Sequence, residues 1–353
     1  MPPAFASSPT QPPRTGWGRS LAGAVRSGRE LLARLDLPPS LASIDAESDF
    51  ACLVPRSLLA RMTPGDPADP ILRQVLPVDA ETRPVAGFTH DAVGDAAASL
   101  TPGLIQKYRG RVLLIATGAC AVHCRYCFRR HFPYGEGPRR LDDFRPAIDA
   151  VAADDSIREV ILSGGDPLML TDQRLSDLLD LIEQVPHVRR LRIHTRLPIV
   201  LPDRICDALL TRLRGSRLQT WVVVHANHAR EVRLDCADAL AQLVNAGLPV
   251  LNQAVWLAGV NDSADAQAEL CESLIDLGVQ PYYLHLLDRT QGTAHFEASE
   301  SAAADAIAAL TCRLPGYAVP RLVREIAGEP SKTPVTPTPP TSASIAPVHT
   351  SEP

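Results

Sequence analysis

The pattern of apolar and polar positions changes at Arg111, after which short apolar strands alternate with helical segments. Runs of leucine and β-branched residues predict strands near Val112–Ala116, Glu159–Leu162, Arg190–Ile193, Gln219–Val224, Pro249–Asn252, Tyr282–Leu286 and Ala318–Val323. Apolar residues at helical spacing predict helices near Asp172–Gln184, Pro202–Arg214, Leu234–Ala246, Ala264–Leu277 and Ala302–Cys312. This alternation indicates a parallel sheet covered by helices, because parallel strands need long crossovers. About six strand–helix units predict an α/β fold, a partial (βα)6-type barrel, with an open doubly wound sheet as the alternative.

The segments on either side of this region have a different character. Before it, loops are long, and a helix from Leu21 to Leu35 is predicted to stop at Pro38 and Pro39. Both ends of the chain are rich in proline and small polar residues, which predicts disorder. The expected organisation is a disordered start (1–15), a helical N-terminal region (16–105), the barrel (106–335) and a disordered tail (336–353).

Charge and hydropathy exclude several classes of protein. The 353 residues include 35 basic and 40 acidic residues, a net charge of −5, which gives no reason to expect nucleic acid or a membrane surface as a partner. No apolar run approaches the length of a membrane span, and the first ten residues lack the features of a signal peptide. We therefore expect a cytoplasmic protein.

Polar residues follow six of the predicted strands at the points where the strands end. In chain order these residues are Cys120 to Cys127, Ser163 to Asp166, His194 to Arg196, His225 to His228, Asn252 with Gln253, and Asp288. The carboxyl ends of parallel strands meet on one face of a barrel, where catalytic groups gather. The order of these residues therefore predicts one crowded active face.

The sharpest local motif is Cys120-Ala-Val-His-Cys124-Arg-Tyr-Cys127. Three thiolates on a short loop can hold three irons of a cubane cluster and leave the fourth iron open. The alternative is a structural zinc ion with His123 or His131 as the fourth ligand, but structural zinc sites use two separated ligand pairs. The other five of the eight cysteines are scattered, and we interpret them as buried apolar residues.

The spacing Cys-x3-Cys-x2-Cys after the first barrel strand, with Tyr126 before the last cysteine, resembles the radical S-adenosylmethionine superfamily. The resemblance implies a partial barrel of that family's type. It also implies a 4Fe-4S cluster on Cys120, Cys124 and Cys127, with S-adenosylmethionine on the open iron. The turn formed by Ser163, Gly164, Gly165 and Asp166 is similar to the family's glycine-rich element beside the cofactor, where small residues allow close approach.

Longer segments narrow the resemblance to the lysine 2,3-aminomutases, which are isomerases that also use pyridoxal phosphate. The matching segments are Arg111–Phe132, Ser163–Asp166, Arg196–Pro198, His225–His228, Gly247–Gln253, Val260–Asp262, Pro281–Phe296 and Val319–Val335. The family's cofactor lysine lies in a Lys-Thr-Pro segment, so the resemblance implies that Lys332 forms the Schiff base with pyridoxal phosphate. The family's aminomutases often have a glycine run before this lysine, whereas this chain has Gly328-Glu329-Pro330-Ser331.

The resemblance also implies roles for charged and polar residues. Arg129 would hold the substrate α-carboxylate, because a guanidinium binds a carboxylate in a bidentate manner. Asp288 and Glu325 would hold the ammonium of a lysine side chain, with Glu325 standing where the fermentative enzymes have aspartate. The remaining implied cofactor-binding residues are Arg111 and Arg196 for the phosphate group, and His225 and Gln253.

The chain carries no cysteine after Lys332, whereas the fermentative enzymes have a further metal-binding segment there. The stretch from Arg324 to Pro334 resembles the bacterial aminomutases that make (R)-β-lysine for modifying elongation factor P. The expected partners are therefore L-lysine, an electron donor protein, and a functional link to elongation factor P and its β-lysine ligase. Alternatives are the same reaction on glutamate or arginine, a radical enzyme without pyridoxal phosphate, or a metal-stabilised binding protein without turnover.

Overall fold

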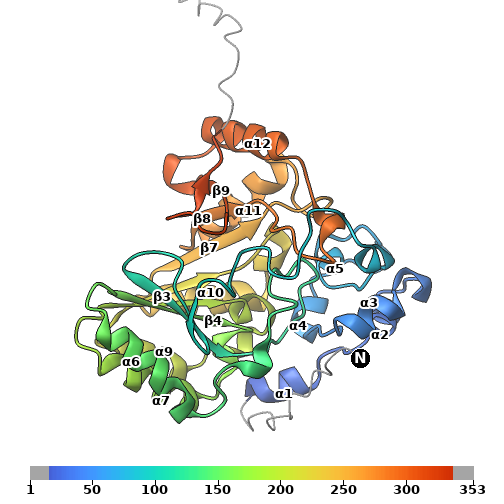
Figure 1. Cartoon of the computed structure of the whole chain (residues 1–353). Coiled ribbons are helices and arrows are strands. Elements are labelled where there is room, and N and C mark those ends of the chain that lie inside the picture. The colour runs from blue at the N-terminus through green and yellow to red at the C-terminus, as the bar shows by residue number, and fades with distance from the viewer. Residues whose placement is uncertain (1–15, 337–353) are drawn as a thin grey trace, which may run out of the picture.

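A single curved sheet with strands in sequence order forms the centre of the protein (Figure 1). The computed structural model describes residues 16–336, so the predicted disordered segments 1–15 and 337–353 lie outside the described residues. The strands are β1 (Ser99–Thr101), β2 (Leu104–Ile105), β3 (Arg111–Thr117), β4 (Glu159–Gly164), β5 (Arg190–Thr195), β6 (Gln219–Val224), β7 (Val250–Val255), β8 (Gln280–His285), β9 (Arg321–Arg324) and β10 (Thr333–Pro334).

Strands β3 to β9 are all parallel, and antiparallel pairs complete the two edges. The predicted strands and the partial-barrel fold are confirmed. The register aligns Val112 with Val160, and Val160 with Leu191, so that apolar residues of neighbouring strands share a face. The sheet begins at Ser99, before the expected start of the barrel at residue 106, because β2 pairs with β3 and β1 pairs with β2.

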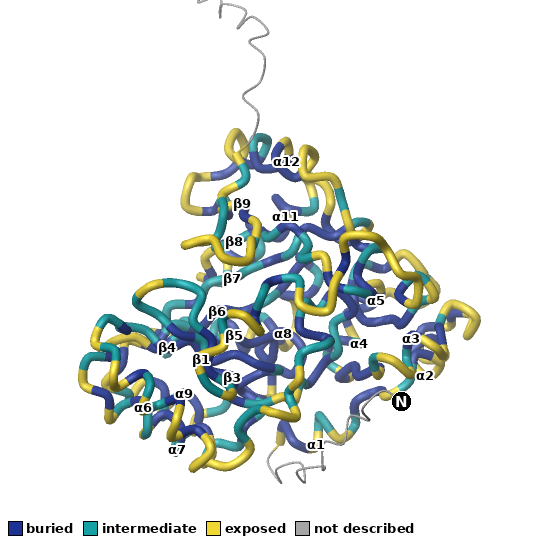
Figure 2. Tube along the Cα trace, in the orientation of Figure 1, coloured by how far each residue is buried: buried dark blue, intermediate teal, exposed yellow. Residues whose placement is uncertain are grey.

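Helices cover the outer face of the sheet, and buried and exposed residues alternate along most of them (Figure 2). The helix α7 begins after Thr171, whose Oγ accepts a hydrogen bond from the Arg174 N–H, and it buries Leu175, Leu178 and Ile182 at helical spacing. The covering helices are α6 (Arg145–Ala153), α7 (Asp172–Glu183), α8 (Leu197–Val200), α9 (Asp207–Arg214), α10 (Asp235–Asn245), α11 (Ala264–Asp276) and α12 (Glu300–Arg313).

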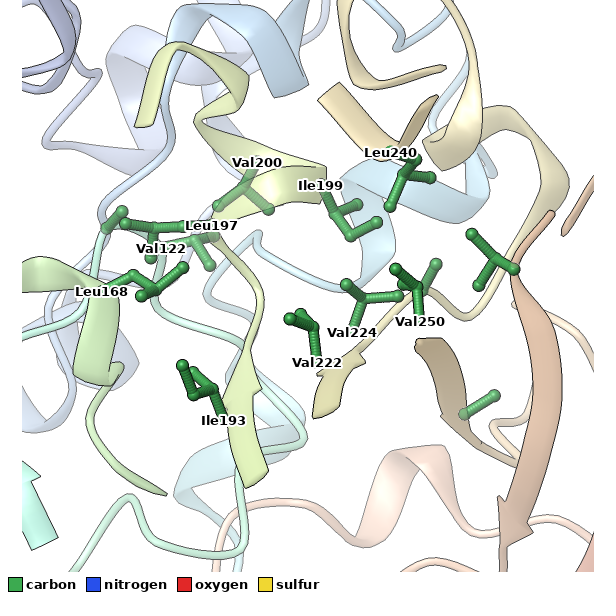
Figure 3. Close-up of a cluster of buried hydrophobic side chains, with 14 of the residues drawn as sticks. Val122, Leu168, Ile193, Leu197, Ile199, Val200, Val222, Val224, Leu240 and Val250 are labelled. Atoms are coloured by element: carbon green, nitrogen blue, oxygen red, sulfur yellow. The ribbon is translucent and has the colours of Figure 1, made fainter. Parts of the chain in front are cut away.

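The core between sheet and helices consists of aliphatic side chains from both layers. Figure 3 shows Ile193, Val222 and Val224 of the strands beside Ile199 of α8 and Leu240 of α10. Burial of such side chains contributes roughly 1.5–3 kcal/mol each, so this layer helps to stabilise the strands that carry the site.

Two predicted helices are interrupted in the structure. The expected helix from Leu21 to Leu35 is wrong, because Val25 leaves the helix to pair with Val54. Ser27 then caps a new helix by accepting a hydrogen bond from the Glu30 N–H. The expected helix Pro202–Arg214 is likewise split into a short 3-10 turn and α9. Helix α6 was not predicted.

The N-terminal region is a set of short helices that pack on one side of the sheet (Figure 1). They are α1 (Gly16–Ala22), α2 (Gly28–Arg34), α3 (Ile44–Asp49), α4 (Arg56–Leu59) and α5 (Pro70–Arg73). After α5 the chain returns to the barrel, where Thr89 pairs with Thr290 in the loop after β8. Of the helices in residues 16–336, none has both the length and the apolar character needed to cross a bilayer.

The 3-10 turns lie mainly in the connections. They are η1 (Pro39–Leu41), η2 (Asp79–Thr82), η3 (Tyr134–Glu136), η4 (Leu141–Phe144), η5 (Pro167–Met169), η6 (Pro202–Arg204), η7 (Ala229–Val232), η8 (Ala294–Phe296) and η9 (Gly316–Ala318).

Candidate functional site

The three cysteines lie on a loop at the carboxyl end of β3, which we call the cysteine loop (Cys120–Cys127). The turn after β4 holds the start of this loop through two backbone hydrogen bonds. The Gly165 N–H donates to Thr117 O at 2.8 Å, and the Asp166 N–H donates to Ala119 O at 2.8 Å. The predicted glycine-rich turn therefore lies directly against the approach to the cysteines.

Two glycines make this close contact possible. Gly164 has φ +125°, and a Cβ atom there would lie 2.4 Å from Thr117 O. A Cβ atom on Gly165 would lie 2.3 Å from Ala119 O. Any side chain would push the two loops apart, so the glycines are needed for packing whatever else they contact.

The three thiols lie near enough to one another for the charge of one to affect its neighbours. Burial raises the pKa of Cys120 well above its ordinary value, and the neighbouring Cys127, Asp166 and Cys124 raise it further. Burial also raises the pKa of Cys127 to about 11. Ionised thiolates need compensating positive charge in such a place, which bound irons would supply. The donor set therefore fits a cluster held by three cysteines.

The residues proposed for a zinc site do not gather around the cysteines. His123 Nδ1 lies 2.8 Å from Ala51 O, and His131 Nε2 lies 3.0 Å from Gln291 O. Within residues 16–336, no three His, Cys, Asp or Glu side chains meet closely enough to hold one metal ion. A cubane does not need them to meet, because each thiolate binds a different iron.

The N-terminal region anchors the cysteine loop from behind. The fully buried Arg125 donates through Nη2 to Glu81 Oε2 at 2.6 Å, and its backbone N–H donates to Gln74 O at 2.8 Å. Arg130 pairs with the same carboxylate at 3.0 Å. We did not predict this ion-pair cluster, since Glu81 lies in a loop-rich stretch where sequence gives no spatial partner.

Arg196 lies beside the cysteine loop. Its Nη1 atom is 2.6 Å from Cys124 Sγ, and its Nη2 atom donates to Glu231 Oε2 at 2.7 Å and to Gln74 Oε1 at 2.9 Å. The phosphate-binding role of Arg196 stays a prediction, and the contacts in the structure are with the cysteine loop.

Asp166 joins the ends of two strands. Its carboxylate accepts hydrogen bonds from Thr195 Oγ1 at 2.8 Å and from the backbone N–H groups of Arg196 at 2.7 Å and Leu168 at 3.0 Å. Burial nevertheless raises the pKa of Asp166 to about 6. These bonds fix the β4 turn relative to β5, and a direct cofactor contact by Asp166 stays a prediction.

A line of alternating charges, here named the ion-pair chain, runs from the cysteine loop to Lys332. Arg129 Nε donates to Asp95 Oδ2 at 2.7 Å, and Asp95 Oδ1 lies 2.7 Å from Lys107 Nζ. Lys107 Nζ is 3.6 Å from Glu325 Oε1, and Glu325 Oε2 is 2.7 Å from Lys332 Nζ. The structure thus brings together three predicted site residues, Arg129, Glu325 and Lys332.

Asp288 lies beside this chain at its Lys332 end. Burial raises the pKa of Asp288 to about 7, with Lys332 and Lys107 lowering it, and Glu325 and Asp95 raising it. For Glu325, burial raises the pKa, but Lys332, Tyr108 and Lys107 outweigh burial and lower it. The two predicted acidic residues therefore share one charged neighbourhood.

The charge of Lys332 acts on the imidazoles of two strands, β5 and β8. Burial lowers the pKa of both His194 and His285 well below the ordinary value, and the charge of Lys332 adds to the effect. His194 Nε2 is buried and has no hydrogen-bond partner among the described residues. A lysine near one buried imidazole nitrogen without a partner fits a covalently held polar cofactor such as pyridoxal phosphate.

The remaining predicted residues lie at three other places. Arg111 is at the amino end of β3, with its guanidinium 4.6 Å from the centre of the Tyr108 ring. His225 Nε2 is 3.4 Å from Tyr126 Oη beside the cysteine loop. Gln253 lies inside β7, not at its end as expected, because the strand continues to Val255. Their cofactor contacts stay predictions.

Three residues near Glu325 and Arg129 were missed by the sequence analysis. Lys107 and Tyr108 precede β3, and Tyr108 Oη donates to Glu325 Oε1 at 2.7 Å. Their closeness to Arg111 was a usable signal, since the segment from Lys107 to Arg111 holds three cations and the aromatic Tyr108. Asp95 lies in an alanine-rich loop, where nothing in the local sequence marks it.

Comparisons with known proteins identify the family that this chain resembles in sequence. The model of the radical SAM superfamily matches residues 114–271. The L-lysine 2,3-aminomutase of Escherichia coli (strain K12) is 47% identical over 327 residues, covering 92% of this chain and 95% of the relative. That of Haemophilus influenzae is 44% identical and covers 90% and 94%. That of Clostridium subterminale is 35% identical and covers 79% and 67%.

Proposed function

Because this chain belongs to the lysine 2,3-aminomutase family of radical S-adenosylmethionine enzymes, we propose that it converts L-α-lysine to (R)-β-lysine with pyridoxal phosphate. As a member of that family it is an isomerase with a 4Fe-4S cluster and S-adenosylmethionine as cofactors. We further propose that the product is used to modify elongation factor P, and that a separate electron donor protein serves the cluster.

The observation that carries the proposal is the position of the acidic pair. Asp288 and Glu325 share a charged neighbourhood with Lys332, and Arg129 stands at the other end of the ion-pair chain. A substrate with a carboxylate at one end and an ammonium at the other matches this order of charges. Glutamate would bring a second carboxylate toward two acids, so the charge pattern favours lysine.

The chain's own residues would bind the cofactors and the substrate, orient them relative to one another, and shield the radical. When bound, the cluster with S-adenosylmethionine would supply radical chemistry, and pyridoxal phosphate would supply a conjugated ring for the amino shift. Cys120, Cys124 and Cys127 would hold the cluster, and Lys332 would hold pyridoxal phosphate. Arg129 would fix the substrate carboxylate close to the cysteine loop, so that the reacting carbon lies between the two cofactor sites.

Support for the link to elongation factor P comes from sequence. The stretch from Arg324 to Pro334 resembles the aminomutases of that pathway. Glu325 lies in this stretch at the end of β9, and Lys332 lies just before β10. The antiparallel pairing of β9 and β10 brings these two residues together.

A competition assay tests the activity. The protein is reconstituted anaerobically with iron and sulfide, then given S-adenosylmethionine, pyridoxal phosphate, a reductant and a mixture of lysine, arginine and glutamate. Chiral chromatography with mass detection should find (R)-β-lysine as the main product. Omission of pyridoxal phosphate should abolish it. Another β-amino acid would overturn the substrate, and no β-amino acid from a fully loaded enzyme would overturn the aminomutase activity.

A second assay tests the use of the product. The reaction mixture is added to elongation factor P and its β-lysine ligase, and the mass of the intact factor is measured. We expect a gain of one lysyl residue that depends on the reconstituted enzyme and exceeds the gain with α-lysine alone. Equal modification with α-lysine alone would contradict the proposed link.

A further inference from the structure

We propose that Asp95 and Lys107 are positioning residues that fix the distance between the two substrate-binding ends of the site. This inference rests on the proposed function, in which Arg129 holds the carboxylate and Glu325 helps to hold the side-chain ammonium. Asp95 and Lys107 touch neither end of the substrate in this scheme. They act through Arg129 and Glu325, and so set which length of amino acid the site accepts.

The first link is the contact between Asp95 and Arg129. The Arg129 Nε donates to Asp95 Oδ2 at 2.7 Å, and its Nη1 donates to Ser163 Oγ at 3.0 Å. The Asp95 N–H in turn donates to Asp91 Oδ1 at 2.8 Å, which fixes the loop. Two bonds to different atoms determine the orientation of a planar guanidinium, leaving Nη2 for a substrate carboxylate.

The second link is the contact between Lys107 and Glu325. Lys107 Nζ donates to Val93 O at 2.8 Å and lies 2.7 Å from Asp95 Oδ1, so its ammonium is held on the Asp95 side. Glu325 Oε1 is 3.6 Å from this ammonium and accepts from Tyr108 Oη at 2.7 Å. Lys107 and Tyr108 thus hold one carboxylate oxygen, while the other faces Lys332.

The ion pairs of Asp95 and Lys107 are largely buried, which strengthens their influence on Arg129 and Glu325. The side chains of Asp95 and Glu325 are 3% and 9% exposed, and that of Lys107 is 19% exposed. Solvent screens charges weakly at such sites, so removal of one member leaves its partners uncompensated. Positive and negative side chains alternate along the ion-pair chain. A displacement of the Asp95 carboxylate would therefore affect Arg129 directly and Glu325 through Lys107.

The test measures substrate binding and length selectivity. Lysine and ornithine, which is one methylene shorter, are titrated into the holoenzyme with cluster, S-adenosylmethionine and pyridoxal phosphate but no reductant, so that no turnover occurs. For Lys107→Met we expect lysine affinity to fall about tenfold or more, the scale of one lost charge-assisted contact. We expect ornithine affinity to fall much less, because Glu325 is no longer held at a set distance from Arg129.

Kinetics and a conservative variant separate positioning from general damage. With reductant, Lys107→Met should raise KM for lysine more than it lowers kcat, and Lys107→Arg should restore most of the lysine preference. Asp95→Asn combined with Lys107→Met should cost little more than the worse single change, since the two residues act as one unit. Arg233→Met, which breaks the exposed pair of Arg233 with Glu269, is the control for loss of a cation elsewhere.

The outcomes distinguish this inference from the proposed function. A wild-type enzyme that does not bind or convert lysine refutes the proposed function. The positioning role is refuted if the wild-type enzyme binds and converts lysine and Lys107→Met leaves the ratio of lysine affinity to ornithine affinity unchanged. The variant must have normal iron content for this comparison. Equal loss of affinity for both amino acids would also refute the positioning role, because a merely structural defect does not depend on substrate length.

Discussion

Glu325 and Lys332 form an ion pair in which Oε2 lies 2.7 Å from Nζ, although sequence resemblance implies separate partners for them. The antiparallel pairing of Thr333 with Arg324 fixes this closeness. A carboxylate built to pair with one ammonium is suited to accept another of similar chemistry. Lys332 and the side-chain ammonium of the proposed lysine substrate would therefore compete for, or share, the same acidic neighbourhood.

The importance of this carboxylate is tested by Glu325→Gln. The change removes a buried negative charge that faces Lys332, Lys107 and the predicted ammonium site. We expect KM for lysine to rise about 10- to 100-fold, the scale of a lost buried charge pair. Steady-state kinetics of the reconstituted enzyme measures it. Glu300→Gln is the matched control, since Glu300 is about half exposed and pairs with Arg324 at the surface. Equal KM values for the two variants would contradict the expectation.

Lysine binding should depend on pH through Asp288. Its pKa is raised to about 7, so below pH 7 the carboxyl is largely neutral and attracts an ammonium weakly. We expect the Kd for lysine to fall as pH rises from 6 to 8, measured by titration without reductant. If Asp288→Asn binds lysine weakly at every pH from 6 to 8, the pH dependence is assigned to Asp288. A midpoint near the ordinary carboxyl pKa in the wild type would contradict it.

The same shift affects folding stability with a defined sign. Between the ordinary pKa of 3.8 and about 7, the folded protein keeps a proton on Asp288 that the unfolded chain releases. The contribution of Asp288 to the free energy of unfolding therefore decreases as pH rises through this window. Denaturant unfolding of the wild type and Asp288→Asn at pH 5 and pH 8 should show the variant gaining relative stability at pH 8. If the difference in unfolding free energy between the two proteins is the same at pH 5 and pH 8, the raised pKa of Asp288 is contradicted.

The strands and the cysteine loop could be predicted because their signals are local. Val112–Ala116 and Gln219–Val224 are apolar runs that lie within the observed strands β3 and β6. The helix predicted for Leu21–Leu35 failed, because the pairing of Val25 with Val54 is a tertiary contact that overrides helical spacing.

The ion-pair chain could not be predicted for a related reason. Asp95 and Glu325 are far apart in sequence, and only the folded barrel brings both to Lys107. Likewise, the buried pair of Arg125 and Glu81 depends on a loop whose path the sequence does not reveal. Local patterns predict elements, whereas charge partners between elements follow from the packing.

The close contact between the β4 turn and the cysteine loop is tested by Gly165→Ala. A Cβ atom there would lie 2.3 Å from Ala119 O, a backbone atom that can only move with the loop. We expect lower iron and sulfide content per chain, and a loss of stability of about 1–3 kcal/mol from overpacking. Gly316→Ala is the control, because no atom lies within 4 Å of the added Cβ. Normal iron content in Gly165→Ala would contradict this expectation, because it would show that the cysteine loop can move without losing the cluster.

The cluster assignment is tested most directly by Cys124→Ser. Cys124 is the middle residue of the cysteine loop, and its Sγ contacts Arg196 Nη1 at 2.6 Å. Because three thiolates are needed to hold three irons, loss of this one should abolish the iron–sulfur absorbance, the release of deoxyadenosine and turnover together. Cys312→Ser is the matched control, since Cys312 is exposed on α12, not buried as expected from the sequence, and its loss should leave all three unchanged. Turnover by Cys124→Ser, or zinc without sulfide in the wild type, would overturn the assignment.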